Sequence, residues 1–232
     1  MSNHLKRLAA PKTWKQPRKT YYWAVRAVPG PHPIERSIPL LVVIRDILNF
    51  ADNSKEAKSI IISGKVLVDG RIVKNYKFPI GFMDVITIPS ANIFARVLID
   101  ENGILRLKEI KPEESSWKLV KVTSKKITEG GKIQIGTHDG RTIVTDQKNI
   151  KRGDTLKISL PDQKILDHHP LVKDTKVYIT GGAHMGTITE IQDIEISRSY
   201  QENTVDTKDN FTTTVSNVFV LGRSANEIGG VA

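Results

Sequence analysis

The chain has 232 residues, of which 39% are hydrophobic and 26% charged, a mixture that excludes a disordered polyelectrolyte. Cysteine is absent, which excludes disulfides, thiol nucleophiles and cysteine-ligated metal sites. The longest apolar run, residues 38–44, is far shorter than the about 18 residues of a membrane-spanning helix. No apolar stretch of a signal peptide follows the first charged residues. We therefore expect a soluble intracellular protein that does not associate with a membrane.

The formal net charge is +10, and most of this excess lies near the amino terminus. Residues 1–39 carry eight Lys and Arg side chains against one acidic residue, Glu35, whereas residues 176–232 carry four against seven. A concentrated positive charge is typical of a protein that binds a polyanion, although a basic tail can also serve solubility alone. The charge distribution favours a polyanionic partner for the amino-terminal arm.

The arm also contains aromatic residues and prolines. Trp14, Tyr22 and Trp23 are interleaved with its cations, and six prolines between residues 11 and 39 prevent a long helix. Such a segment buries too little surface to fold alone, so we expect it to be mobile in the free protein. Its rings can stack on bases while its cations contact phosphates, or the rings can fasten the arm to the protein's own core. The candidate RNA-binding residues of the arm are Lys6, Arg7, Lys12, Trp14, Lys15, Arg18 and Lys19.

Residues 38–88 have the clearest pattern of secondary structure. Apolar residues at helical spacing predict an amphipathic helix over 40–51. Asn53, with Glu56 three residues later, is typical of a capped helix start, and Gly64 is a natural end for this second helix. The sequence therefore predicts two consecutive helices in this region.

A β-hairpin is expected directly after the second helix. Asp69-Gly70 lies between two apolar runs, which is the strongest short-range signal of a two-residue hairpin turn. Residues 85–88 then predict a third strand.

This order of helices and hairpin resembles the RNA-binding module shared by ribosomal protein S4, certain pseudouridine synthases and tyrosyl-tRNA synthetases. The module resemblance rests on Ser63-Gly64-Lys65-Val66, on Val68-Asp69-Gly70 and on residues 81–86. With further stretches of the chain, the sequence resembles the archaeal and eukaryotic S4e family of small-subunit ribosomal proteins, and its short carboxyl end resembles the archaeal type. Those stretches are residues 4–11, Gly30-Pro31-His32, 137–143, 179–182 and 229–232.

The resemblance implies a phosphate-binding face on this module. Helix amino ends present backbone amides, and basic side chains can surround them. Such a surface recognises the shape and backbone of duplex RNA rather than its sequence. A charged helix face can also be merely solvated, and Asp46, Asp52, Glu56 and Asp69 can neutralise part of the patch. The candidate residues here are Arg45, Lys55, Lys58, Lys65, Arg71, Lys74 and Lys77.

Residues 91–170 alternate apolar and polar residues in short runs, which predicts a small closed β-sheet. His138-Asp139 precedes a glycine in a hairpin signal, so turn chemistry explains this pair better than catalysis does. His168-His169 lacks a third spaced ligand, which favours a linker over a metal site. The strands are expected within 117–123, 132–137, 141–145 and 155–160.

Residues 175–222 predict strands around a glycine-rich turn that resembles the KOW motif, the start of a small SH3-like barrel. Glycine there allows a tight turn, and it also lets backbone amides approach phosphates closely. Thr189 stands where the motif usually has glycine, so we expect strain or a different turn at that point. The candidate turn residues are Gly181, Gly182, His184 and Gly186.

The sequence thus predicts an α+β chain of several modules. The expected parts are a basic arm over 1–37, an S4-like RNA-binding domain with two helices and a hairpin over 38–90, a central β-rich domain over 91–170, and a KOW/SH3-like barrel with a tail over 171–232. No phosphate-loop, nucleophile-elbow, metalloprotease or dinucleotide-binding motif is present, so we expect no enzymatic activity, cofactor or metal.

The predicted function is that of a structural constituent of the cytoplasmic small ribosomal subunit. Its expected partners are small-subunit rRNA and neighbouring ribosomal proteins, and we expect a monomer when the protein is free. The alternative is an RNA-modification factor of the pseudouridine synthase type, or a transcription-associated RNA-binding factor, built from the same modules.

Overall fold

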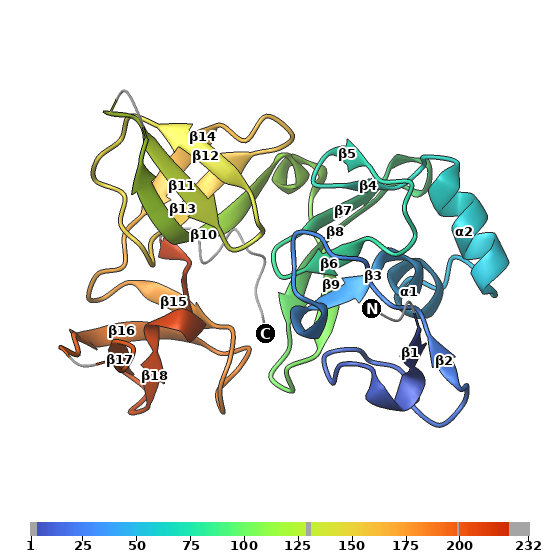
Figure 1. The fold of residues 1–232 in the computed structure, drawn as a ribbon, viewed down its shortest axis with the longest axis horizontal. Helices are drawn as coiled ribbons and strands as arrows, with labels where there is room; N and C mark the ends of the chain where they lie inside the picture. The colour runs from blue at the N-terminus through green and yellow to red at the C-terminus, as the bar shows by residue number, and fades with distance from the viewer. Residues whose placement is uncertain (1–3, 129–130, 199, 223–232) are drawn as a thin grey trace. The chain divides into compact units, whose positions relative to one another are not determined.

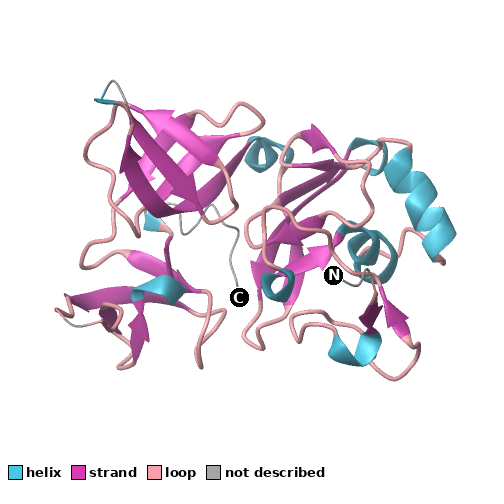
Figure 2. Cartoon of the chain, in the orientation of Figure 1, coloured by secondary structure: helices cyan, strands magenta, loops and turns pink. Residues whose placement is uncertain are grey.

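The structure, a computed structural model, describes residues 4–128, 131–198 and 200–222 (Figure 1). Strands dominate it, with short helices between them (Figure 2). No helix among the described residues is long and apolar enough to cross a membrane. The archaeal-type carboxyl end lies outside the described residues. The chain forms two compact units, Met1–Asp100 with Ile104–Ser116, and Glu101–Gly103 with Trp117–Ala232.

The first unit contains an antiparallel sheet of order β5-β4-β7-β8-β9, a two-stranded pair β3-β6 and a two-stranded ribbon β1-β2. The strands that follow residue 90 therefore extend the sheet of the preceding module. The bounds are β1 Leu5–Lys6, β2 Trp23–Ala24, β3 Ser37–Pro39, β4 Leu67–Val68, β5 Arg71–Ile72, β6 Pro79–Gly81, β7 Val85–Ile88, β8 Ile93–Ile99 and β9 Leu105–Glu109.

The first helix is shorter and wider than the sequence indicates. Helix α1, Leu40–Val42, continues into a π-helical segment, Val43–Ile47. The Leu48 amide donates to the Val43 carbonyl at 2.9 Å, and Asn49 then takes a left-handed φ of 53°. The left-handed Asn49 and the hydrogen bond from the Phe50 amide to the Ile44 carbonyl at 3.0 Å then end the helix. The expected helix over 40–51 is therefore wrong in its last turn.

The second helix and the hairpin form as predicted. Helix α2, Ser54–Ile62, begins at Asn53, whose Oδ1 accepts hydrogen bonds from the amides of Lys55 and Glu56 at 3.0 and 2.9 Å. Asp69 and Gly70 both have positive φ, 51° and 74°, as a type I′ hairpin turn requires. The Asn53 cap and the Asp69-Gly70 turn depend only on the backbone of neighbouring residues, so the sequence predicts them without knowledge of the tertiary structure.

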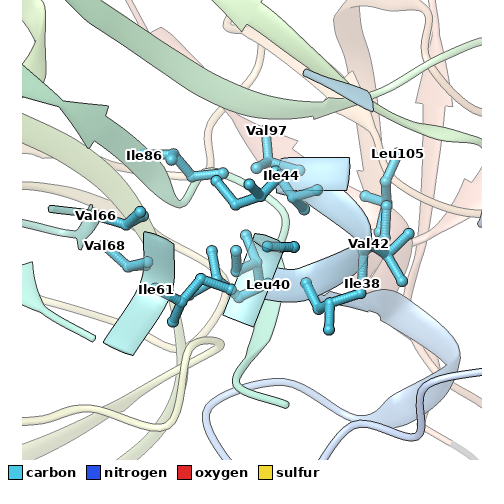
Figure 3. Close-up of a cluster of buried hydrophobic side chains, with 14 of the residues drawn as sticks. Ile38, Leu40, Val42, Ile44, Ile61, Val66, Val68, Ile86, Val97 and Leu105 are labelled. Atoms are coloured by element: carbon cyan, nitrogen blue, oxygen red, sulfur yellow. The ribbon is translucent and has the colours of Figure 1, made fainter. Parts of the chain in front are cut away.

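One apolar core joins the helices to the sheet and holds α2 in a fixed place (Figure 3). Its buried side chains come from the α1 segment, from α2 and from the strands, so each element depends on the others. Burial of one such side chain is worth about 1.5–3 kcal/mol. The labelled members are Ile38, Leu40, Val42, Ile44, Ile61, Val66, Val68, Ile86, Val97 and Leu105.

The arm packs on this module through Trp14. That side chain is 4% exposed, belongs to the same core, and donates from its Nε1 to the Ser37 carbonyl at 2.6 Å. Trp23 on β2 and Tyr22 just before that strand are exposed. Trp14 thus fastens the arm to the core, whereas the other two rings remain accessible. The expected mobility of the arm does not fit the segment around Trp14.

The second unit contains two antiparallel five-stranded sheets, of order β12-β11-β10-β13-β14 and β18-β17-β16-β15-β19. The four strands expected between residues 117 and 160 are confirmed, and the unit's small cores are rich in Val and Ile. The bounds are β10 Trp117–Ile127, β11 Ile133–Thr137, β12 Thr142–Thr145, β13 Thr155–Ser159, β14 Ile165–His169, β15 Lys176–Ile179, β16 Ile188–Glu195, β17 Thr204–Thr207, β18 Thr212–Thr214 and β19 Val218–Val220.

Short 3₁₀ turns connect several strands in both units. They lie at Arg7–Ala9, Ile34–Arg36, Pro89–Ala91, Pro112–Ser116 and Val215–Asn217.

Lys121 on β10 links the two sheets of the second unit. Its Nζ donates to three backbone carbonyls, those of Val215, Ser216 and Val218, at 2.7, 2.9 and 2.7 Å. Three charge-assisted hydrogen bonds hold the turn before β19 against β10.

Candidate RNA-binding surface

The basic residues of the arm fall into two groups with different surroundings. Lys6 pairs with Trp23 across the ribbon, and its Nζ lies 5.5 Å from the centroid of the Tyr22 ring. Arg7 is only 5% exposed and donates from Nε to the Pro17 carbonyl at 2.6 Å, so it holds the arm in shape. Arg18 donates to the Leu8 carbonyl at 3.2 Å. The candidate arm cations that the structure exposes are Lys6, Lys12, Lys15 and Lys19, and Arg36 at the end of the arm is exposed as well.

Arg45 is engaged with the protein itself. Its Nε and Nη2 donate to Asp46 at 2.7 and 2.8 Å, and its Nη1 donates to the Ser54 hydroxyl at 2.7 Å. The hydrogen bonds that Arg45 donates to Asp46 raise the pKa of Arg45, and Gln16 of the arm also donates to Asp46. Arg45 therefore joins the π-helical segment to the start of α2, and its charge is compensated locally.

Lys58 and Lys77 converge on one aromatic ring. Their Nζ atoms lie 4.6 and 5.7 Å from the centroid of Tyr76, within the range of cation–π attraction. The backbone fixes this place, because the Leu41 amide donates to the Tyr76 carbonyl at 3.0 Å and the Val28 amide donates to the Lys77 carbonyl at 3.0 Å. Two predicted residues from separate elements are thus brought together.

The remaining cations lie toward the other end of α2. Lys65 follows that helix and is exposed, and the aliphatic part of Lys74 lies over Gly64 at the helix end. Arg71 is exposed on β5, and Lys55 is exposed in the first turn of α2. The module therefore presents positive charge near both ends of α2.

A small cavity of about 200 Å³ lies beside the converging lysines. Its lining includes Trp23 and Arg26 from the arm, and Ser54, Lys58 and Tyr76 from the module. The sequence interpretation missed Arg26 and Tyr76 as site residues. The available signal was the segment 74–77, where an aromatic ring lies among cations as in the arm.

The glycine-rich turn between β15 and β16 is tight and needs its glycines. A Cβ on Gly181 would lie 2.5 Å from Asn217 Oδ1, and Gly182 and Gly186 have φ of 96° and 81°. His184 stacks on Phe211, with ring centroids 4.2 Å apart and planes at 20°. The four candidate residues therefore form a tight turn, in which His184 contacts Phe211.

Thr189 does not alter this turn. It lies within β16 opposite Val177 and is buried, and its φ is not left-handed. The expected strain is wrong, because the chain has already returned to extended strand geometry before this residue.

The histidine pair at 168–169 does not form a linker. Both residues belong to β14, and His168 Nε2 lies 2.7 Å from Asp154 Oδ2. His169 is buried beneath Gly222, where a Cβ would lie 2.4 Å from its ring. Among the described residues, no three His, Asp or Glu side chains are grouped so that they could hold a metal ion.

His138-Asp139 lies in a hairpin turn, as predicted. Asp139 is buried and its Oδ2 lies 2.7 Å from Lys118 Nζ and 2.9 Å from Arg141 Nε. Thr137 also donates to this carboxylate. Burial by itself would raise the pKa of Asp139, but Lys118 and the hydrogen bonds outweigh it and lower the pKa to about 2. The carboxylate is a structural anion.

Three family profiles match successive parts of this chain. They are the RS4NT (NUC023) domain over residues 1–35, the S4 domain over 38–86 and the Ribosomal family S4e over 94–165.

The chain is also similar to full-length relatives and to a solved structure. It is 45% identical over 229 residues to the small ribosomal subunit protein eS4 of Methanothermobacter thermautotrophicus, covering 97% of this chain and 94% of that protein. It is 46% identical over 230 residues to the protein of the same name from Methanocaldococcus jannaschii, covering 94% and 93%. The crystal structure of the 30S ribosomal protein S4e from Thermoplasma acidophilum is 42% identical, with a TM-score of 0.73, and the match covers 82% of this chain and 96% of that one. This agreement extends from the arm to the second unit, and the chain belongs to the ribosomal protein S4e family.

Proposed function

We propose that this protein is a structural constituent of the small ribosomal subunit and binds rRNA through its phosphate backbone and shape. The observation that carries the proposal is the arrangement of cations on a rigid first unit. Exposed lysines lie near both ends of α2 and along the arm, and the Trp14 anchor joins the arm to the same core. Membership of the S4e family supports the same function.

The contacts that this surface can make are mainly electrostatic. Lysine is a flexible point charge that suits phosphate oxygens without requiring a particular base. The deep groove of duplex RNA is closed to side chains, so a convex basic surface recognises its backbone and width. The proposed contact set remains Lys6, Arg7, Lys12, Trp14, Lys15, Arg18, Lys19, Arg45, Lys55, Lys58, Lys65, Arg71, Lys74 and Lys77, in which Arg7, Trp14 and Arg45 act by shaping the surface.

Four proposed segments have different roles. Residues 1–37 anchor the protein on RNA and 38–90 form the docking face for RNA. Residues 91–170 form a β-rich spacer, and 171–232 form a KOW/SH3-like barrel with a tail. Strands β8 and β9 connect the second and third segments, because β8 pairs with β7 and β9 pairs with β8. In the barrel, Gly181, Gly182, His184 and Gly186 form a compact turn that brings backbone amides close to an RNA phosphate or a neighbouring protein.

Binding is the whole proposed activity, with no covalent step. The four buried aspartates of the described residues support this, because each is engaged within the protein. Asp84, Asp139 and Asp154 face His32, Lys118 and His168 at 3.0, 2.7 and 2.7 Å, and Asp69 Oδ1 accepts a hydrogen bond from the Val85 amide at 3.0 Å. A catalytic aspartate of the pseudouridine synthase type needs an open substrate site. We propose a free monomer that enters the cytoplasmic ribosome and contacts rRNA and neighbouring ribosomal proteins there.

The salt dependence of rRNA binding tests this proposal. If six to ten phosphates are neutralised, the association constant with small-subunit rRNA falls by about three to five decades between about 50 and about 200 mM salt. The measurement is a fluorescence anisotropy titration of the purified chain at several salt concentrations. An association constant that does not change over this range would contradict the proposal.

A further inference from the structure

The cavity beside Tyr76 combines aromatic and cationic walls. It has a volume of about 200 Å³, below the roughly 300–1,000 Å³ of pockets that hold drug-sized ligands. The arm forms one wall through Trp23 of the ribbon and Arg26 after it, and the module forms the other through Ser54, Lys58, Tyr76 and Lys77. A space of this size suits a single planar ring system rather than a base pair.

The charge of the cavity favours an anion. Arg26, Lys58 and Lys77 contribute three cations, and no carboxylate is among the described residues that line it. Lys58 and Lys77 are drawn to one place by the face of Tyr76. A phosphate at the mouth of the cavity therefore meets a concentrated positive potential.

Trp23 supplies an accessible aromatic surface at the same site. It is 54% exposed, with Tyr22 edge-on at 4.6 Å and His4 tilted at 5.4 Å between ring centroids. Its backbone pairs with Lys6 in the ribbon, and its indole contacts the Tyr22 and His4 rings. Bases stack on such rings in proteins that bind single-stranded nucleic acid, with little dependence on sequence.

We propose that this cavity binds one unpaired nucleotide of RNA, with its base against Trp23 and its phosphate near Lys58 and Lys77. The inference rests on the proposed function and adds a contact that duplex RNA cannot make, because paired bases are stacked within the helix. The arm and the module would then hold the extruded nucleotide between them.

The test compares a short unstructured RNA oligonucleotide, a fully paired RNA duplex and AMP as probes of the full chain. Trp14 and Trp117 are buried, so quenching of exposed tryptophan emission by the oligonucleotide in the unmodified chain reports on Trp23. The affinities of all variants are compared by fluorescence anisotropy of labelled probes, which does not depend on tryptophan. Trp23→Ala should weaken oligonucleotide binding by about 5- to 150-fold and duplex binding by less than about twofold. Trp23→Phe keeps an aromatic ring and should retain most of the affinity that Trp23→Ala loses. Lys58→Gln is a second variant, which removes a cation of the cavity and keeps the Trp23 indole.

The control is Tyr200→Ala, which removes a fully exposed ring from the second unit and should leave the affinity for all three probes unchanged. Equal losses on single strand and duplex, or no loss on the single strand, would overturn the inference. AMP binding as tight as that of the oligonucleotide would also overturn it, since the cavity would then belong to a free nucleotide. Failure of the proposed function is separate, because the unmodified chain would then not bind small-subunit rRNA at all.

Discussion

Asp139 shows how a single buried carboxylate organises the second unit. Lys118 is fully buried, and its Nζ lies 2.7 Å from that carboxylate. Thr137 and Arg141, which flank the hairpin turn, contact the same carboxylate. A buried ion pair contributes little net stability by itself, but loss of one partner leaves an uncompensated charge. The hairpin turn and β10 are therefore tied together by this residue.

Asp139→Asn should destabilise the protein by about 3–5 kcal/mol, because Lys118 would remain buried without a counter-charge. Chemical denaturation of the second unit is the measurement. Asp162→Asn, at an exposed position, is the matched control and should change stability by less than about 0.5 kcal/mol. Equal losses of unfolding free energy in both variants would show that the Asp139 carboxylate does not hold the hairpin turn to β10.

The pKa of Asp139 also predicts an acid sensitivity. Because its folded-state pKa is about 2 against an ordinary value of 3.8, the folded chain holds the charged form more strongly than the unfolded chain does. This contribution of about 2 kcal/mol is present above about pH 4 and is lost as the pH falls toward about 2. Unfolding titrations of Asp139→Asn should lack this part of the pH dependence, and an unchanged acid profile would contradict it.

At the scale of elements, helix α2 has one face that packs on the core and another that presents basic side chains to solvent. Ala57 and Ile61 are fully buried against the core, while Lys55 projects from the opposite face. The Asn53 cap fixes where the helix begins and hence which residues face outward. The helix can therefore change its charge without loss of its fold.

Charge reversal of Lys55, Lys58 and Lys65 should weaken rRNA binding far more than reversal of Lys164 and Lys173. Each lysine that contacts a phosphate should lower the log–log salt slope by about one, so the triple variant should lose up to about three. Lys164 is the cleaner control, since Lys173 pairs with Asp193 at 2.8 Å. Equal effects from the two sets would mean that the face of α2 does not contact RNA.

The arm packs on the core of the first unit through one large side chain. Trp14 lies in the first unit's core, so amide hydrogen exchange around it should be slow in the free protein. Trp14→Ala should cost about 3–5 kcal/mol and should speed exchange in the arm before it affects the sheet. Exchange as fast as that of an unfolded chain in the unmodified arm would contradict this packing.

At the scale of the molecule, local signals were easier to predict than tertiary ones. Asn53 and Asp69-Gly70 act through neighbouring backbone, and the structure confirms them. The π-helical turn at Val43–Ile47 departs from the regular α-helical spacing on which the sequence prediction rests. The cavity lined by Trp23 and Tyr76 needs two segments that are distant in sequence, so no single pattern indicated it.

The charge of the whole chain is distributed unevenly between its two units. Most of the positive excess lies in residues 1–39, which pack on the first unit, whereas residues 176–232 are slightly acidic. We therefore expect electrostatic binding chiefly at the first unit, and backbone contacts at the glycine-rich turn of the second.

The most direct test of the account is where the protein sediments in a native lysate of its own organism. At moderate salt we predict one copy per small ribosomal subunit in the gradient, released only as the salt concentration rises. Recovery chiefly in the unbound fraction, or at far less than one copy per subunit, would contradict the account and favour a factor that visits RNA transiently.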